Sequence, residues 1–250
     1  MTILYDCYTQ IADLLGQDAE PYESVELVEQ YRQFWRPNDV RIILLAESHI
    51  FTSNLDRELE LKTIKDLLGY PSNYAKFVYC LAYGENSLTI GENHPPKDGC
   101  PQFWKVLFSC TNQIQSSETF APIQKSPTPT NQRIQNKVNL LKQLQQNGIW
   151  LIDASIMALY DKGKKPSNKV MAKTIRTSWS CYTRNVIREA DPDHIIVVGK
   201  GVADILEQEL NDLMDTNYTV IAQANARLTA EQHHNNFKTY YRLCSSPTAI

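Results

Sequence analysis

Four short, continuously apolar segments constrain the fold of this chain more than any other feature of its sequence. They lie at residues 40–46, 149–152, 194–198 and 218–222, and they are rich in β-branched and aromatic residues. Unbroken apolarity, without an alternation of apolar and polar residues, is typical of strands that are covered on both faces. The sequence therefore predicts a central sheet of four strands with protein packed on either side.

Amphipathic segments separate these strands. Residues 24–35 begin with Ser24 at a capping position, and residues 131–147 place apolar side chains on one face before Gly148. Residues 201–214 repeat the same apolar spacing. Each of the three segments is predicted to form a helix.

The alternation of strands and helices indicates a mainly parallel sheet with helices on both faces. We therefore expect a three-layer α/β/α fold over residues 1–250 as one domain, with a helical segment at residues 1–37. Residues 84–101 and 116–130 are rich in proline, glycine and small polar residues, which predicts loops. Residues 245–250 are predicted to form a flexible tail.

Composition excludes several classes of protein. Lysine and arginine number 25 against 28 acidic residues, so the formal net charge is −3. The chain is therefore not a polycation that coats nucleic acid, although this net charge is compatible with a local basic patch. A hydrophobic content of 42% in 250 residues is enough for a substantial core. No segment has the length of a membrane span, and the first twenty residues lack a signal-peptide pattern. We expect a soluble cytoplasmic protein without a membrane partner.

The six cysteines are scattered along the chain without a CxxC pair. Closely spaced thiolate ligands are the usual signature of a zinc site, so we expect no metal. The spacing does not indicate a disulfide scaffold either, and we expect reduced, mostly buried thiols. The "GKG" at residues 199–201 lacks the full P-loop pattern, and no cofactor is expected.

Polar or glycine-rich sequence follows each of the four predicted strands. The first strand runs into "ESH" at residues 47–49, and the second ends at Asp153. The third is followed by "GKGVAD" at residues 199–204, and the fourth by "QANAR" at residues 223–227. In open α/β sheets, ligands bind beyond the carboxyl ends of the strands. We therefore expect these four ends to share one pocket.

The order of these strand ends resembles the uracil-DNA glycosylase superfamily. The resemblance is carried by "IILLAESH", "GIWLIDAS", "HIIVVGKG" and "IAQANARL", and by the basic stretch "DKGKKPSN" with Trp179 after it. In that family the first strand ends in a G-Q-D-P-Y or G-x-N-P motif with the water-activating residue, and the second ends in an asparagine that reads the base. The fourth leads into an H-P-S-P motif, whose histidine stabilises the departing base. The resemblance implies a base-flipping hydrolase that acts on DNA.

The resemblance assigns catalytic positions to the end of the first strand. With Ala46 at the family's first glycine, Ser48 takes the position of the catalytic Asp or Asn, Glu47 precedes it, and His49 takes the position of the proline. Cleavage of an N-glycosidic bond develops positive charge on the sugar and negative charge on the base. Glu47 could orient or deprotonate water and His49 could donate a proton, so these three residues are the predicted catalytic group. Alternatively, Glu47 and His49 cap a helix or pair with each other.

Base recognition is assigned to residues after the second and fourth strands. Asp153 takes the position of the base-reading asparagine; because an ionised carboxylate only accepts hydrogen bonds, it would prefer a base edge with N–H groups. Its alternative role is to cap a helix that begins just after it. Gln223 replaces the family's histidine and Asn225 its serine, and both are predicted to bind substrate. Arg227 matches the motif variant that ends in arginine and is predicted to contact DNA phosphate.

Aromatic and basic residues complete the predicted site. Three aromatic residues between the first two strands could stack on a flipped base, and three lysines after the second strand could contact DNA. The alternatives are core packing for the aromatic residues and a solvated loop for the lysines. The aromatic residues are Phe77, Tyr79 and Tyr83, and the lysines are Lys162, Lys164 and Lys165.

Three functions are compatible with this sequence. The first is a divergent DNA glycosylase-like hydrolase that removes a modified or deaminated base, with DNA as its partner. The second is a catalytically inactive module of the same fold that binds a nucleobase, nucleotide or single-stranded nucleic acid; Gln223 in place of the family's histidine favours it. The third is an esterase with Ser48 as nucleophile and His194 or His233 as base, although the G-x-S-x-G elbow is absent.

Overall fold

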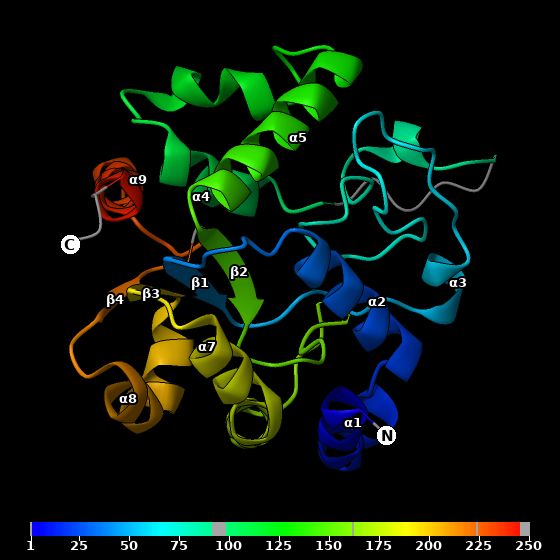
Figure 1. Cartoon of the computed structure of the whole chain (residues 1–250), viewed down its shortest axis with the longest axis vertical. Coiled ribbons are helices and arrows are strands. Elements are labelled where there is room, and N and C mark those ends of the chain that lie inside the picture. The colour runs from blue at the N-terminus through cyan, green and yellow to red at the C-terminus, as the bar shows by residue number, and fades with distance from the viewer. Residues whose placement is uncertain (1, 92–98, 162, 224, 246–250) are drawn as a thin grey trace.

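A four-stranded parallel sheet forms the centre of the molecule in the computed structural model, which describes all residues except 1, 92–98, 162, 224 and 246–250. The strand order is β2-β1-β3-β4, and every neighbouring pair is parallel. Helices cover both faces (Figure 1), so the predicted three-layer α/β/α fold is confirmed. The strands are β1 (Ile42–Ala46), β2 (Ile149–Asp153), β3 (His194–Val198) and β4 (Tyr218–Ile221).

Three helices lie on one face of the sheet, above it in Figure 1. They are α4 (Pro101–Thr111), α5 (Thr130–Gln146) and α9 (Ala230–Ser245). Helix α5 buries its apolar stripe against β2, and α4 packs between α5 and α9. The predicted loop at 116–130 contains a short 3₁₀ helix, η3 (Ser117–Ile123), because the Ser116 hydroxyl caps its first turn.

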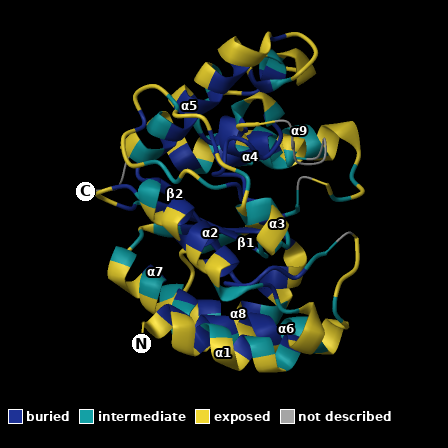
Figure 2. Cartoon of the chain, turned by 90° about the vertical axis from the view of Figure 1, so that its right-hand side faces the viewer, coloured by how far each residue is buried: buried dark blue, intermediate teal, exposed yellow. Residues whose placement is uncertain are grey.

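The opposite face is covered by the helices that follow β2 and β3. These are α6 (Asn168–Ser178), α7 (Arg184–Ala190) and α8 (Lys200–Met214), with one π-helical turn, η4 (Trp179–Thr183), between α6 and α7. The first helix, α1 (Ile3–Leu15), packs against α6 and η4. Figure 2 shows buried residues on the inner sides of these helices and exposed residues on their outer sides. No helix in the described part of the chain is both long and apolar enough to cross a membrane.

Helix α2 (Tyr22–Phe34) lies beside the edge strand β2, where the indole Nε1 of Trp150 donates a hydrogen bond of 2.9 Å to the carbonyl of Arg32. The predicted cap at Ser24 is wrong. The helix begins two residues earlier, after Pro21, and the buried Ser24 hydroxyl donates to the carbonyl of Thr52 at 2.7 Å. The remaining short helices are η1 (Gly16–Asp18), α3 (Asn54–Arg57) and η2 (Asn86–Leu88).

The prediction that all six cysteines are reduced is wrong for two of them. Cys7 of α1 and Cys181 of η4 form a disulfide, although they are 174 residues apart in the sequence. Packing of α1 against η4 brings them together, which no spacing of cysteines along the chain would indicate. The other four cysteines, Cys80, Cys100, Cys110 and Cys244, are not disulfide-bonded.

The disulfide between Cys7 and Cys181 predicts how many cysteines an alkylating reagent can label. We expect iodoacetamide to alkylate four cysteines when the protein is denatured without reductant, since Cys7 and Cys181 are bonded to each other. The same sample reduced before alkylation is the control and should carry a label on every cysteine. Intact mass measures both. Full labelling without reductant would show that the disulfide is not formed.

Candidate functional site

A cavity of about 390 Å³ lies at the carboxyl ends of the four strands. In the order β2-β1-β3-β4, the connection from β1 to β2 runs toward one edge of the sheet and the connection from β3 to β4 toward the other. Ligands of open α/β sheets bind at the point between the strands where this direction changes. The volume is in the usual range for small-molecule sites. All four strand ends contribute to its wall, through Glu47 after β1, Asp153 of β2, Val198 of β3 and Gln223 after β4.

A buried ion network lies beneath this cavity. His49 Nε2 is 2.7 Å from Oε1 of Glu20, and His49 Nδ1 is 3.5 Å from Oδ2 of Asp153. Arg32 of α2 donates to the same Asp153 oxygen at 3.0 Å and also pairs with Glu29. Glu20, Glu29 and Arg32 were not predicted from the sequence. Charged side chains on the side of α2 that faces the core could have indicated Glu29 and Arg32. Glu20 precedes this helix and has no such local signal.

His49 is held as an imidazolium between two carboxylates. Burial disfavours its charge, but Glu20 and Asp153 outweigh this effect and raise the pKa of His49 to about 9. Glu20 is itself fixed, because its carboxylate accepts hydrogen bonds from the backbone N–H groups of Ala158 (2.6 Å) and Thr52 (3.4 Å). The His49 side chain is completely buried, so its contacts support a role in holding Asp153 in place and not the predicted role of proton donor. It also does not pair with Glu47.

The contacts of His49 with Glu20 and Asp153 make the free energy of unfolding depend on pH. The pKa of His49 is raised from 6.5 to about 9 on folding, so its contribution is fully present below pH 6.5 and is lost as pH rises through 9. We expect the free energy of unfolding of the native chain to fall across this interval, and to fall less in His49→Gln. Urea denaturation at a series of pH values measures both slopes. Equal slopes in the two proteins would contradict the assignment.

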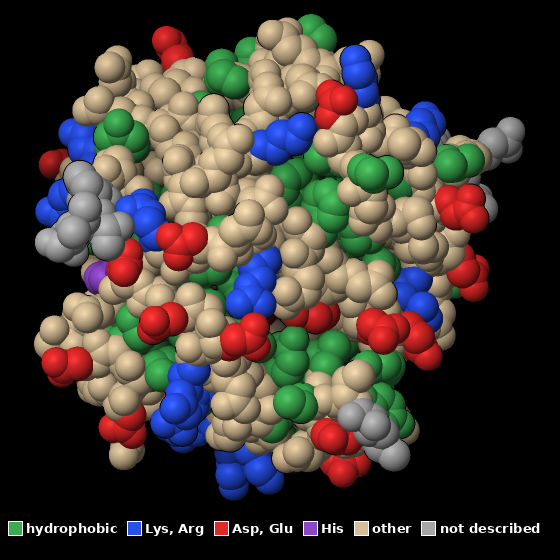
Figure 3. All heavy atoms as spheres, in the orientation of Figure 1, with side chains coloured by type: hydrophobic (Ala, Val, Ile, Leu, Met, Phe, Trp, Pro, Cys, Tyr) green, Lys and Arg blue, Asp and Glu red, His purple; other side chains and the backbone are tan. Residues whose placement is uncertain are grey.

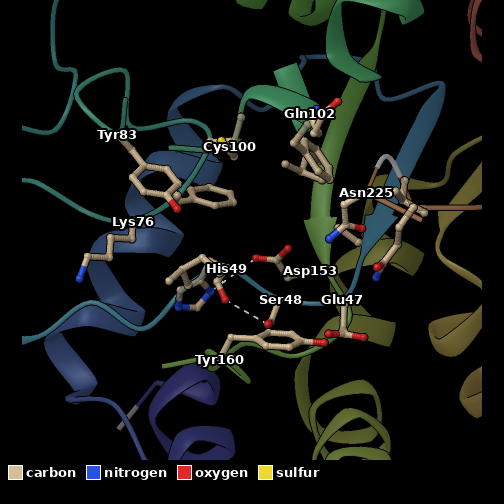
Figure 4. A pocket seen from close by; sticks show the side chains of 18 of the residues that line it. Glu47, Ser48, His49, Lys76, Tyr83, Cys100, Gln102, Asp153, Tyr160 and Asn225 are labelled. Atoms are coloured by element: carbon tan, nitrogen blue, oxygen red, sulfur yellow. Dashed lines mark hydrogen bonds and ion pairs between the residues drawn. The ribbon is translucent and has the colours of Figure 1, made fainter. Parts of the chain in front are cut away.

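Asp153 presents one oxygen to a ligand. Arg32 and His49 occupy its Oδ2, whereas Oδ1 accepts no hydrogen bond from any residue that the structure describes. Asp153 lies between His49 and Asn225 in Figure 4. The alternative role as a helix cap is wrong, because the next helix, α6, begins at Asn168 and is capped by Ser167.

Glu47 occupies the wall of the cavity immediately after β1. The Tyr160 hydroxyl faces its carboxylate (Figure 4), and burial together with the negative charge of Glu47 raises the pKa of Tyr160. Among the described residues, no cation lies within ion-pair distance of Glu47. Its Oε1 is buried and has no hydrogen-bond partner in that part of the chain. Glu47 as a whole is only partly buried and lines the cavity, so its carboxylate can meet a water molecule or a ligand there.

The Ser48 hydroxyl is engaged with the backbone. It donates to the carbonyl of His49 at 3.0 Å and accepts from the N–H of Leu159 at 3.2 Å. His194 lies at the first position of β3, at the opposite end of the strand from the cavity, and His233 lies in α9. Neither imidazole contacts Ser48, so the geometry lacks the nucleophile–base pair that an esterase requires.

Aromatic rings form part of the cavity wall. Phe77 and Tyr83 line it, as predicted for stacking residues, and so do Phe103 and Tyr160. Tyr79 does not line it. This residue is buried in the core, where its hydroxyl accepts a hydrogen bond of 2.9 Å from the backbone of β2, so its predicted contact with substrate is not compatible with its position.

The residues that follow β4 line the cavity beside the turn that follows β3. Gln223 and Asn225 both line the wall. Gly199 has φ of +119°, and a Cβ at this position would lie 2.8 Å from Cγ of Gln223. Glycine is therefore needed here, because only it combines this backbone conformation with the close approach of Gln223.

The predicted DNA contacts lie on the surface. Lys164, Lys165 and Arg227 are exposed, and none of them lines the cavity. Lys162 lies outside the described residues. On the face shown in Figure 3, basic and acidic side chains are interspersed, so that face presents no broad area of one sign.

The fold and the cavity define a three-layer α/β/α protein with a pocket of carboxylates and aromatic rings at the carboxyl ends of its strands. Within the described ranges, no group of three or more His, Cys, Asp or Glu side chains could hold a metal ion. Comparison of the chain with protein-family models, with curated proteins and with solved structures finds no match.

Proposed function

We propose that this protein is a DNA glycosylase-like hydrolase that removes a modified or deaminated base. The observation that carries the proposal is the position of Glu47, a carboxylate without a cationic partner among the described residues, in the same cavity as Asp153 and four aromatic side chains. Base-removing enzymes receive a flipped base in a pocket of this kind, with aromatic or apolar walls and hydrogen-bonding groups for the base edge.

Each group has a place in the reaction. Glu47 orients a water molecule toward C1′ of the sugar and takes its proton, while its negative charge stabilises the cationic sugar in the transition state. Phe77 stacks on the extruded base. Asp153 Oδ1 accepts a hydrogen bond from an N–H group of the base, since Arg32 and His49 contact the other oxygen and hold this carboxylate in place.

In this proposal, basic side chains outside the cavity contact the DNA duplex. Lys164 and Lys165 follow the segment that carries Tyr160, and Arg227 follows the segment that carries Gln223, so both groups continue from cavity-lining loops. Exposed lysine and arginine side chains contact phosphates without reading the sequence. Binding to DNA is therefore expected to weaken as salt increases.

The proposal is tested with duplexes that each carry one altered base, including uracil, hypoxanthine and alkylated purines. Incubation with the protein should leave alkali-labile abasic sites in at least one of them, and Glu47→Gln should leave none above background. Failure to cleave any duplex, by a protein shown to be folded, would contradict a hydrolase.

One observation favours a second function, a binding module without hydrolysis. The position of the family's histidine is held by Gln223, and the imidazole of His49 is buried beneath the cavity. A site of this kind would bind a nucleobase or nucleotide and leave it intact. A ligand-induced rise in Tm without release of base separates this function from the first.

A further inference from the structure

We propose that the base accepted by this cavity is positively charged, as is a purine alkylated at N7 or N3. The inference rests on the proposed glycosylase-like function and specifies its substrate class. Three features carry it: the charge that the cavity presents to a ligand, the aromatic walls, and the lack of an accessible proton donor at the position of the family's histidine.

The cavity presents carboxylates, because both of its cations are engaged elsewhere. Four residues with charged side chains contribute to its lining: Glu47, His49, Lys76 and Asp153. The Lys76 ammonium binds Asp56 at 2.8 Å, and Figure 4 shows this side chain extending away from Glu47 and Asp153. The His49 side chain is completely buried in the network beneath the cavity. A ligand therefore meets two negative charges and no free positive charge among the described lining residues.

The buried network adds to this negative character. It contains three carboxylates, those of Glu20, Glu29 and Asp153, and two cations, those of Arg32 and His49. With all five groups ionised, every carboxylate contacts a cation, but the network as a whole carries one more negative than positive charge. A cationic ring above Asp153 would compensate this net negative charge in a site of low dielectric, whereas a neutral ring would not.

The walls suit a cationic ring as well. Phe77, Tyr83, Phe103 and Tyr160 contribute four aromatic side chains to one cavity. The faces of such rings carry partial negative charge and attract cations, most strongly where water is excluded. Aromatic walls with carboxylates between them form the type of site that binds organic cations.

The chemistry of the departing base supplies the third argument. A neutral base leaves with the electron pair of the C1′–N bond as an anion, so it needs a proton donor or a positive charge nearby. Gln223 supplies only an amide at this position, and His49 is sealed beneath the cavity. A base that is already cationic needs no acid.

With a cationic base the step balances using groups of this cavity. The C1′–N bond breaks, its electron pair neutralises the alkylated purine, and the base leaves uncharged. The water oxygen forms the new bond to C1′, and the proton of that water passes to the Glu47 carboxylate and then to solvent. The products are an abasic site and a neutral alkylated purine, and no oxidant, reductant or metal is needed.

Binding and excision are measured together to test this inference. Isothermal titration at mildly acidic pH compares 7-methylguanosine, whose ring is cationic, with guanosine, which is neutral and of nearly the same size. We expect binding of the cationic nucleoside to be about tenfold tighter or better. Glu47→Gln should lose most of this preference, and the control Glu207→Gln, which changes an exposed carboxylate on α8, should keep it.

Excision is followed with duplexes that carry 7-methylguanine, uracil or hypoxanthine. Excision of 7-methylguanine in preference to the two neutral bases supports the inference. Equal or faster excision of a neutral base would overturn it and leave the proposed hydrolase standing. Cation-selective binding without excision would support the ligand class and contradict the hydrolase. Equal binding of the two nucleosides, or binding of neither, would overturn the inference.

Discussion

Replacement of Glu47 by glutamine is expected to slow base removal by about 10²–10⁴-fold, the usual contribution of a positioned general base. Glutamine has nearly the same size but cannot take the proton of the attacking water. Because Glu47 forms no ion pair with any described residue, we expect the free energy of unfolding to change by no more than about 0.5 kcal/mol. Single-turnover release of the base and urea denaturation measure the two effects.

The matched control for this variant is Glu207→Gln on α8, where the carboxylate is exposed and does not line the cavity. It should release base at the native rate. A native rate in Glu47→Gln as well would remove Glu47 from the mechanism, and a large loss of stability in that variant would make its slower rate uninformative about catalysis.

Replacement of Arg32 by methionine is expected to lower the free energy of unfolding by about 3–5 kcal/mol. The substitution leaves the buried carboxylates of Glu29 and Asp153 without the cation that contacts both. Uncompensated charge in a site of low dielectric is among the most destabilising changes that one substitution can make. Urea denaturation measures the loss, and binding of a base should weaken with it because Asp153 is no longer fixed.

Arg176→Met provides the comparison, since Arg176 forms an exposed ion pair with Glu209 at 3.4 Å. Such pairs contribute at most about 1 kcal/mol. A loss of stability in Arg32→Met no greater than that in Arg176→Met would show that the network beneath the cavity does not stabilise the fold.

The sheet could be predicted because each strand is an unbroken apolar segment. The boundaries of β3 match the prediction, and β1 begins two residues late, at Ile42. Strand β2 extends one residue further, to Asp153, because the ladder with β1 continues to that residue. Burial on both faces leaves a strong local signal in the sequence, whereas the residue at which a strand ends depends on its pairing with the neighbouring strand.

The candidate site could be predicted only where its residues directly follow a strand. Glu47, Asp153 and Gln223 were found in this way, since the ends of parallel strands meet at one edge. Glu20 lies 29 residues from His49, and Arg32 lies 121 residues from Asp153, so no local pattern connects these pairs. Tertiary packing alone creates them, and it also overrides the stacking role expected of Tyr79.

A crystal structure of Glu47→Gln bound to a duplex with a single 7-methylguanine would test most directly whether this cavity receives a nucleobase. We predict that the alkylated base is turned out of the duplex, lies against the ring of Phe77, and is within hydrogen-bond distance of Asp153 Oδ1. A complex in which the base stays stacked in the duplex, or in which DNA occupies another face and leaves the cavity without a base, would contradict this prediction.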